Sequence, residues 1–231
     1  MNPSIALLQQ VALFQPLPEA ALAEIATLSQ PRAVEEGGFF FMQGDQARHM
    51  YVLTQGRVKL TQVSTDGQQV GLRMITPTQM FAGIAILSPQ KGYPVSAEAM
   101  EDSSALAWEG TDLRSLADRY PALSLGVMDV MRGYIEEMQS RFRELSTERV
   151  ERRVARALLR LTMQTGKKLE DGGIEIAISR QDLAEMSGTT LFSASRILSE
   201  WERQGLIEAG RGRVVIRKPH GLVSIAEDLA K

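Results

Sequence analysis

Residues 179–205 read SRQDLAEMSGTTLFSASRILSEWERQG, and this stretch decides the fold of the C-terminal part of the chain. An S-x-x-D start signal at Ser179 begins one short helix, and Gly188 can adopt the left-handed conformation that ends it. Thr189 or Thr190 then caps a second helix. That helix has an inward face of apolar residues at helical spacing, namely Ala194, Ile197, Leu198 and Trp201. The stretch predicts two short helices that meet at a tight corner.

The outward face of the second helix carries an arginine and hydroxyl groups near its N-terminal end, which is what a reader of the DNA major groove requires. The outward residues are Leu191, Phe192, Ser195, Arg196 and Ser199. An ordinary helical hairpin with a solvated face has the same pattern. This segment alone therefore leaves both interpretations open.

The segment that follows the helix pair has the pattern of a β-hairpin. Residues 206–208 and 214–216 are short apolar strands, and the glycine-rich turn 209–213 separates them. A helix pair followed by such a hairpin is a winged helix-turn-helix. Arg211 and Arg213 would lie at the tip of the wing against DNA phosphates, although a soluble turn has the same composition.

We expect Arg196 to read a guanine through a bidentate contact, and Thr190 and Ser193 to hold phosphate near the helix N-terminus. Leu191 and Phe192 are expected to touch a thymine methyl group. The complete set of predicted DNA-binding residues is Ser179, Arg180, Thr189, Thr190, Leu191, Phe192, Ser193, Ser195, Arg196, Arg211 and Arg213.

Charge is unevenly distributed over the 231 residues, whose formal net charge is −2. Residues 148–231 carry 15 basic and 12 acidic side chains, a net charge of +3, whereas residues 1–147 carry 11 and 16, a net charge of −5. A basic C-terminal part beside an acidic N-terminal part suits a modular protein whose second module meets DNA.

The chain has no cysteine, which excludes disulfides, thiolate metal sites and cysteine-ligated iron–sulfur clusters. No signal peptide and no long apolar run is present, so we expect a cytoplasmic protein that does not contact the membrane. Only two histidines are present, and no metal site is expected. His49 could hold a haem iron, but it also fits a solvated polar residue at the start of a strand, so the cofactor stays unknown.

Residues 34–108 consist of short alternating apolar runs separated by glycine turns such as Gly37-Gly38 and Asp66-Gly67. The clearest run is 51–63, in which Val58 and Leu60 alternate with polar residues. Several short strands at regular spacing predict an antiparallel roll or barrel. Two short helices over residues 5–28 precede it.

A long helix is predicted to end near Leu145, after a short helix that Pro121 interrupts. Its apolar residues recur at near-heptad spacing and form a candidate dimer interface, namely Val127, Met131, Tyr134, Met138, Phe142 and Leu145. The same seam could pack on the roll of its own chain. The fold class is therefore α+β, with a β-roll sensor domain and N-terminal helices at 1–111, a linker and long dimerisation helix at 112–147, and a winged helix-turn-helix domain at 148–231.

This succession of modules resembles the catabolite-activator/fumarate-nitrate-regulator (CRP/FNR) family of bacterial transcription factors, whose β-roll is like the cyclic-nucleotide-binding jelly roll. The segments that carry the resemblance are Gln43-Gly44-Asp45, residues 51–58, Asp66-Gly67, Phe81-Ala82-Gly83 and residues 178–207. The resemblance implies a homodimer that binds palindromic promoter DNA, and RNA polymerase as a further partner. The string from Thr189 to Arg196 is similar to the nitrogen-oxide-reductase regulator subgroup, which implies a response to nitric oxide or nitrogen oxides.

The chain departs from the nucleotide-binding members at both polar anchors. Those members place Glu-Leu after the Phe-x-Gly turn and Arg before Ser or Thr, whereas Ile84-Ala85 follows Gly83 here and Val95 precedes Ser96. Without an arginine at position 95, the buried phosphate of a cyclic nucleotide would lack its charge-assisted hydrogen bonds. We therefore expect no use of cyclic AMP, and an apolar effector pocket formed by Gly83, Ile84, Ala85, Val95, Ser96 and Tyr134.

Two other functions are compatible with parts of the sequence. A ligand-binding regulatory module could act on a partner protein without DNA binding and use the helical hairpin as a docking site. An enzyme built on the roll is disfavoured, because the chain lacks cysteine, the roll has no plausible histidine pair, and no paired-carboxylate or phosphate-cradling motif is found. The sequence favours a DNA-binding regulator that is not an enzyme.

Overall fold

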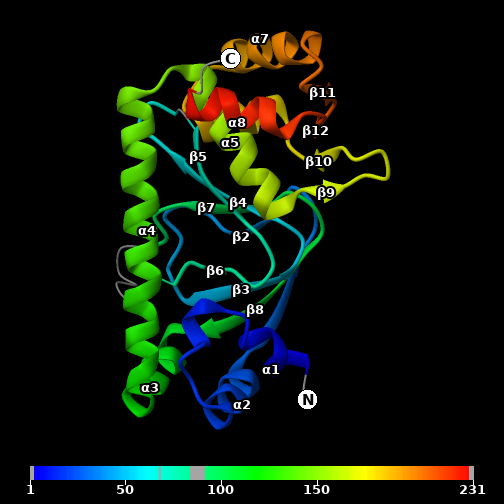
Figure 1. Ribbon diagram of the computed structural model, residues 1–231. Helices are drawn as coiled ribbons and strands as arrows, with labels where there is room; N and C mark the ends of the chain where they lie inside the picture. Colours follow the sequence, from blue (N-terminus) through cyan, green and yellow to red (C-terminus); the bar gives the residue numbers. More distant parts are fainter. Residues whose placement is uncertain (1–2, 68, 84–91, 229–231) are drawn as a thin grey trace. The chain divides into compact units, whose positions relative to one another are not determined.

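The computed structural model describes residues 3–67, 69–83 and 92–228 and forms two compact units, residues 1–138 and 139–231. The division falls inside the long helix α4 (Pro121–Thr147). The predicted domain boundaries at 111 and 147 follow secondary structure rather than contacts, and they stay a prediction. The first unit is the roll and the second contains the helix-turn-helix (Figure 1).

The roll consists of two four-stranded antiparallel sheets with the strand orders β1-β8-β3-β6 and β2-β7-β4-β5. This confirms the predicted roll, and Figure 1 shows the two sheets as the blue to green strands of the first unit. Its strands are β1 (Gln30–Val34), β2 (Phe39–Phe41), β3 (His49–Gln55), β4 (Val58–Val63), β5 (Gln69–Ile75), β6 (Met80–Phe81), β7 (Ser96–Ala99) and β8 (Ser103–Glu109).

Both faces of strand β3 are buried, because its side chains alternate between two cores. Tyr51 and Leu53 point into the roll, whereas Met50 and Val52 point outward to a second core. The outer core is closed by the N-terminal helices α1 (Pro3–Leu8), η1 (Ala12–Phe14) and α2 (Glu19–Leu28).

Trp108 on β8 anchors the outer core. Its side chain is fully buried, packs edge-on against Phe14 and donates a hydrogen bond of 2.7 Å from Nε1 to the carbonyl of Ile25. A buried indole N–H needs such a partner. The N-terminal helices are therefore part of the sensor unit rather than a loose lead-in.

Helix α3 (Gly110–Arg119) follows the roll, and Pro121 begins α4 at a position where its missing N–H costs nothing. Gly126 lets α4 approach η1 closely, since a Cβ there would overlap the carbonyl oxygen of Leu13. Val127 and Val130 pack on the outer core. One face of α4 is thus buried within its own unit.

The second unit confirms the winged helix-turn-helix. Helix α5 (Val150–Thr165) leads to the helix pair α6 (Arg180–Ser187) and α7 (Leu191–Arg203). The sheet β11-β12-β10-β9 contains β9 (Lys167–Lys168), β10 (Ile174–Ile176), β11 (Ile207–Gly210) and β12 (Arg213–Ile216). Strand β10 pairs with β12 of the wing, and α8 (Pro219–Glu227), which the sequence analysis did not predict, packs near α5.

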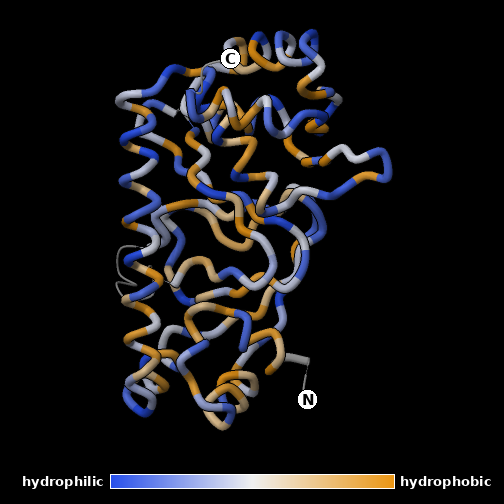
Figure 2. The backbone as a smooth tube through the Cα atoms, viewed as in Figure 1, coloured by the Kyte–Doolittle hydropathy of each residue, from blue (hydrophilic) through white to orange (hydrophobic). Residues whose placement is uncertain are grey.

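The core of the second unit is made by the inward faces of α5, α6 and α7. The alternation of orange and blue along these helices in Figure 2 follows the apolar spacing. Leu158, Leu198 and Trp201 are fully buried, and Trp201 Nε1 donates to Glu151 Oε1 at 3.1 Å. The apolar face predicted for the second helix is therefore confirmed as its packing face.

Gly188 makes the corner between α6 and α7. Its φ is +61°, and the Thr189 N–H donates to the Ala184 carbonyl at 3.0 Å, which closes the end of α6. A Cβ on Gly188 would overlap the Leu145 side chain at the end of α4. The left-handed backbone conformation therefore favours glycine at the corner, and a larger side chain there would also have to displace the tip of the exposed Leu145 side chain.

Replacement of this glycine tests both restrictions. Gly205 has a similar φ of +64°, but a Cβ there would meet only the tip of Lys218, at 3.9 Å. Gly205→Ala should lower the free energy of unfolding by about 1 kcal/mol through backbone strain alone. Gly188→Ala should lower it by about 2–4 kcal/mol, because overpacking adds to strain. Urea unfolding followed by circular dichroism measures both; equal losses would show that Leu145 does not restrict the corner.

Candidate nucleic-acid interface and effector region

Two hydroxyl groups cap the helices of the helix-turn-helix. Ser179 Oγ accepts from the Asp182 N–H at 3.0 Å, and Thr190 Oγ1 accepts from the Ser193 N–H at 3.1 Å. The sequence left open whether Thr189 or Thr190 caps the second helix, and the structure assigns the cap to Thr190. These caps satisfy backbone donors that would otherwise be free at each helix start.

The N-terminal half of α7 presents a free face. Phe192 is 78% exposed, Leu191 and Arg196 are also exposed, and Ser195 is half-buried. Within the described part of the chain, the Arg196 guanidinium has no hydrogen-bond or ion-pair partner. The side chain is therefore available to a ligand outside the protein.

The two arginines predicted at the wing tip differ in their surroundings. Arg211 lies in the exposed turn between β11 and β12. Arg213 is the first residue of β12, and its Nη1 lies 3.1 Å from Glu175 Oε2 on the neighbouring strand. Of these two described arginines, only Arg211 is therefore an unpaired cation, because the register of β12 places Arg213 beside a carboxylate.

Sequence reasoning missed Arg217, which fixes the base of the wing. Its guanidinium donates to Asp171 Oδ2 at 2.6 Å and to Glu208 Oε1 at 2.7 Å. These hydrogen bonds lower the pKa of both carboxyl groups. The pairs join the loop before β10 to β11 and orient the hairpin; no local motif distinguishes Arg217 from its basic neighbours.

Arg153 on α5 is a second residue that sequence reasoning missed. Its guanidinium donates to three backbone carbonyls, those of Ser187 at 3.0 Å, Gly188 at 2.9 Å and Glu148 at 3.0 Å. The first two belong to the corner of the helix-turn-helix, and the third lies between α4 and α5. One side chain therefore ties the corner to the segment in which the long helix ends.

A buried ion pair reinforces this junction. Glu144 near the end of α4 is buried, and both of its carboxylate oxygens accept from Arg160 Nη1 of α5, at 2.8 and 3.0 Å. Loss of either partner would leave a charge in a low-dielectric site. The last turn of α4 is thereby attached to the DNA-binding unit.

The predicted effector region is only partly described. Ile84 and Ala85 lie outside the described residues. Ser96 Oγ accepts from the Gln43 N–H at 2.9 Å, and Val95 packs on the core of the roll. These two residues are therefore engaged in the protein's own packing.

Aromatic rings fill the interior of the roll beside this region. Phe41 stacks on Tyr93 with ring centroids 3.9 Å apart, and Tyr51 stacks on Phe81 at 5.1 Å. Stacked rings of this kind pack at the density of a protein core. The described residues of the roll interior beside this region therefore pack on one another.

Tyr134 of α4 faces its own unit. Its hydroxyl lies 3.3 Å from the Met80 carbonyl, and the Arg73 guanidinium lies 4.7 Å above its ring. Burial raises the pKa of Tyr134. This contact joins α4 to strands β5 and β6 and removes Tyr134 from the exposed face of the helix.

His49 starts β3 and is half-buried. The Tyr93 hydroxyl accepts from its backbone N–H and donates to its carbonyl, both at 2.9 Å. Burial, together with Arg32, lowers the pKa of the imidazole, so that its neutral form is favoured. Its surroundings include charged groups of Arg48, Glu109 and Arg114, which suit a hydrated edge of the roll.

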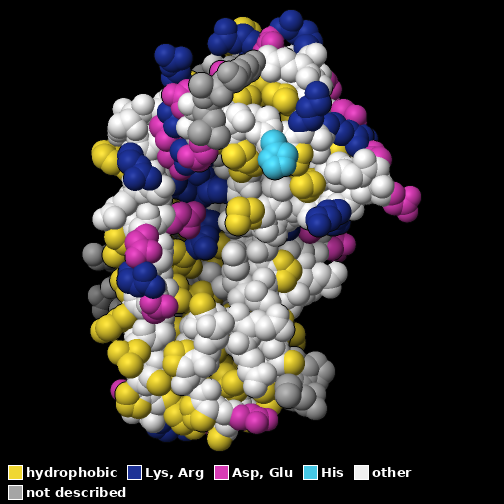
Figure 3. Space-filling model, viewed as in Figure 1, with side chains coloured by type: hydrophobic (Ala, Val, Ile, Leu, Met, Phe, Trp, Pro, Cys, Tyr) yellow, Lys and Arg dark blue, Asp and Glu magenta, His cyan; other side chains and the backbone are white. Residues whose placement is uncertain are grey.

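The exposed apolar face of α4 differs in part from the predicted seam. Met138, Phe142 and Leu145 are exposed, as a dimer interface requires, whereas Val127, Met131 and Tyr134 are half-buried toward their own unit. Their neighbours complete the exposed stripe, which consists of Leu125, Met128, Ile135, Met138, Phe142 and Leu145. Figure 3 shows yellow side chains alternating with charged ones along the edge where α4 lies in Figure 1.

Two classes of site are absent from the described residues. No group of three or more histidine, cysteine or acidic side chains is placed to hold a metal ion. Among the described helices, none combines the length and apolarity needed to cross a bilayer.

Both units match known domain families. Residues 31–120 match the cyclic nucleotide-binding domain, and residues 152–225 match the Crp-like helix-turn-helix domain. The chain is a CRP/FNR-type DNA-binding transcription regulator. It is not an enzyme, since its relatives are transcription regulators.

Relatives span nearly the whole chain. The cyclic AMP receptor protein of Thermus thermophilus is 29% identical over 87% of this chain and 90% of its own length. The anaerobic regulatory protein of Bacillus subtilis is 24% identical over 84% of this chain and 82% of its own length. The crystal structure of a CRP-family transcriptional regulator, also from Thermus thermophilus, has a TM-score of 0.73 and 25% identity, and the match covers 85% of this chain and 96% of that one.

Proposed function

We propose that this regulator binds palindromic promoter DNA as a homodimer, reads it through Arg196, and does so without a cyclic nucleotide. The observation that carries the proposal is the exposed and unpaired Arg196 guanidinium on the capped N-terminal half of α7. A planar guanidinium in this position suits the two acceptors of a guanine edge in the major groove.

The remaining predicted residues have supporting roles at the backbone of the DNA. Ser179, Arg180, Thr189, Thr190 and Ser193 lie at the two helix starts, where hydroxyls, N–H groups and the helix dipole favour phosphate. Arg211 is the phosphate contact of the wing, and Arg213 contributes less because Glu175 already pairs with it. Leu191 and Phe192 suit thymine methyl groups.

Dimerisation is proposed through the exposed stripe of α4. Met128, Ile135 and Phe142 of this stripe recur every seven residues, and Met138 and Leu145, also seven residues apart, form its second row. An exposed apolar patch of this kind marks an association surface. Two copies joined along α4 would hold their recognition helices about 34 Å apart, one turn of DNA.

The signal is proposed to be something other than cyclic AMP. Val95 stands where nucleotide binders place an arginine, Ser96 Oγ already accepts from Gln43, and stacked rings fill the roll beside them. A nitric-oxide or nitrogen-oxide response, with or without haem, follows only from the similarity of residues 189–196 to that subgroup. A regulator bound at a promoter works in the cytoplasm, where RNA polymerase is its next partner.

One observation favours a second candidate. Leu191 and Phe192 are large apolar side chains on an exposed helix face, which also suits docking to a protein rather than to DNA. The two functions differ in their salt dependence. Binding of phosphates by cations weakens steeply with salt, whereas apolar docking does not.

Arg196→Ala tests the reading role. On the DNA site that the protein selects from a random pool, we expect an affinity loss of about 1–3 kcal/mol and relaxed preference at one position per half-site. Arg211→Ala is a matched arginine truncation on the wing. It should weaken binding to all DNA sequences alike and reduce the slope of log affinity against log salt concentration by about 1. Fluorescence anisotropy at two salt concentrations measures both. Unchanged base preference in Arg196→Ala would remove Arg196 from the reading role, and salt-independent binding would favour the protein-docking function.

Ile135→Glu combined with Phe142→Glu tests the dimer. Two carboxylates in the apolar stripe should convert the protein to a monomer in analytical ultracentrifugation and abolish high-affinity binding to the palindrome, because burial of unpaired charge is unfavourable. Met163 is 90% exposed on α5, outside the stripe, and Met163→Glu is the control that should remain dimeric. A dimer that survives the double substitution would show that copies associate elsewhere.

Cyclic AMP is expected not to bind. Calorimetric titration of the full-length protein with cyclic AMP at millimolar concentration should give no saturable heat, because a buried phosphate would lack its cation. Val95→Arg is the informative variant, since it restores the arginine of the nucleotide binders. Saturable heat of micromolar affinity in the unmodified protein would contradict the proposal.

A further inference from the structure

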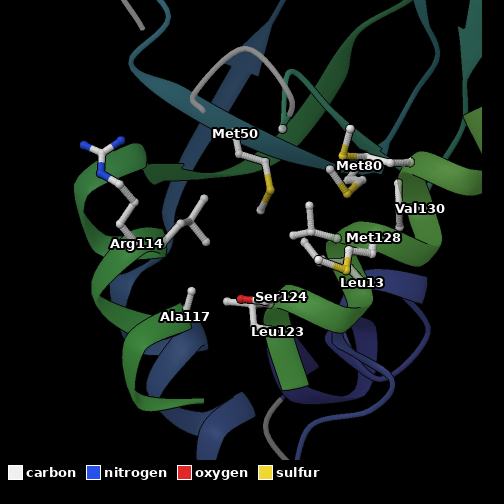
Figure 4. A pocket seen from close by; sticks show the side chains of 13 residues that line it. Leu13, Met50, Met80, Arg114, Ala117, Leu123, Ser124, Met128 and Val130 are labelled. Carbon is white, nitrogen blue, oxygen red and sulfur yellow. The ribbon is translucent and has the colours of Figure 1, made fainter. Parts of the chain in front are cut away.

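A cavity of about 300 Å³ lies outside the roll, between its outer face and helices α3 and α4. Met50 enters it from β3, Met80 from β6 and Leu13 from η1, while Ala117 of α3 and Leu123 of α4 form the opposite wall (Figure 4). All of these residues belong to the first unit. Of the described residues in the predicted effector region, Gly83 also lines this cavity, whereas Val95, Ser96 and Tyr134 do not.

The lining is almost wholly apolar. Four methionines contribute to it, Met50, Met80, Met128 and Met131. The two polar side chains are Arg114 and Ser124; Figure 4 shows the Arg114 guanidinium pointing away from the cavity. Among the described lining residues, none would compensate an ionised group, so a charged ligand would lose its hydration without replacement there.

Small residues keep the space open. Ala117 and Ser124 contribute short side chains to the wall, and Gly83 contributes none. A Cβ on Gly83 would overlap the Met80 methyl group. The Met80 side chain can therefore take its position because residue 83 has no side chain. Methionine side chains are flexible and polarisable, and they adapt their shape to apolar ligands.

The volume indicates the size of the occupant. A dry apolar cavity of roughly 150 Å³ accepts one benzene-sized molecule. This cavity is about twice as large and lies at the low end of the range for small-molecule sites, roughly 300–1,000 Å³. It would therefore take a molecule of up to three fused or linked rings, or an aliphatic chain of similar volume.

The position of the cavity connects it to α4. Met128 lines the cavity and also belongs to the exposed stripe of the same helix. Val130 lines it and packs on the outer core. A ligand that displaces these side chains therefore acts on the helix that carries the stripe.

We infer that this cavity is a binding site for a small, uncharged, apolar molecule. The site does not depend on the proposed DNA function, because all of its walls belong to the sensor unit. The proposed ligand site and the proposed DNA binding can therefore be refuted independently of each other.

The experiment uses N-phenyl-1-naphthylamine, an uncharged fluorescent probe with linked rings, and the full-length protein. We expect saturable fluorescence enhancement with one probe per chain, and displacement of the probe by toluene. Ala117→Leu and Ser124→Leu fill the cavity from two different helices, and each should weaken probe binding at least tenfold. Two variants are used so that a folding defect in one, detected by circular dichroism, leaves the other informative.

Ser115→Leu is the matched control, because Ser115 lies on α3, is exposed and does not line the cavity. This variant should bind the probe as the unmodified protein does. The sulfonated analogue 8-anilinonaphthalene-1-sulfonate should bind at least tenfold more weakly than the uncharged probe.

Three results would overturn the inference. The first is the absence of saturable binding, and the second is equal affinity for the charged and uncharged probes. The third is loss of binding in Ile135→Glu/Phe142→Glu with full binding retained in the two cavity-filling variants. That pattern would place the probe on the exposed stripe of α4, because Ile135 and Phe142 do not line the cavity.

Discussion

Helix α4 carries two apolar faces side by side, and the rest of the structure depends on how they are used. One face, with Val127, Val130 and Tyr134, packs on the roll and the N-terminal helices. The other, from Leu125 to Leu145, remains exposed. The first unit covers only one of the two apolar faces of α4. The second face is therefore available to another surface.

The end of the same helix belongs to the DNA-binding unit. Leu145 packs on the glycine corner of the helix-turn-helix, Glu144 pairs with Arg160, and Arg153 holds three carbonyls around the junction. These contacts use both packing and charge, and they join the last turn of α4 to the helices that would meet DNA. The last turn of α4 is therefore fixed to the helix-turn-helix within the second unit.

In the described residues of the first unit, the interior of the roll is packed and open volume lies on its outer side. Aromatic stacking occupies the interior between the sheets. The open volume lies on the outer side, among methionines and small residues.

Local chemistry in the sequence determined the helix-turn-helix, the wing, the order of modules and the family. Caps at Ser179 and Thr190, the glycine at 188 and strand alternation act within a few residues, so they can be recognised without a structure. Tertiary structure alone decided which face of α4 is buried, since Val127 and Tyr134 share a helical period with the exposed residues and only contact with the roll separates them. It also decided that Glu175 pairs with Arg213, that Arg217 and Arg153 fix the wing and the corner, and where the cavity lies. Each of these depends on residues distant in sequence, whose meeting follows from strand register and helix packing rather than from any local pattern.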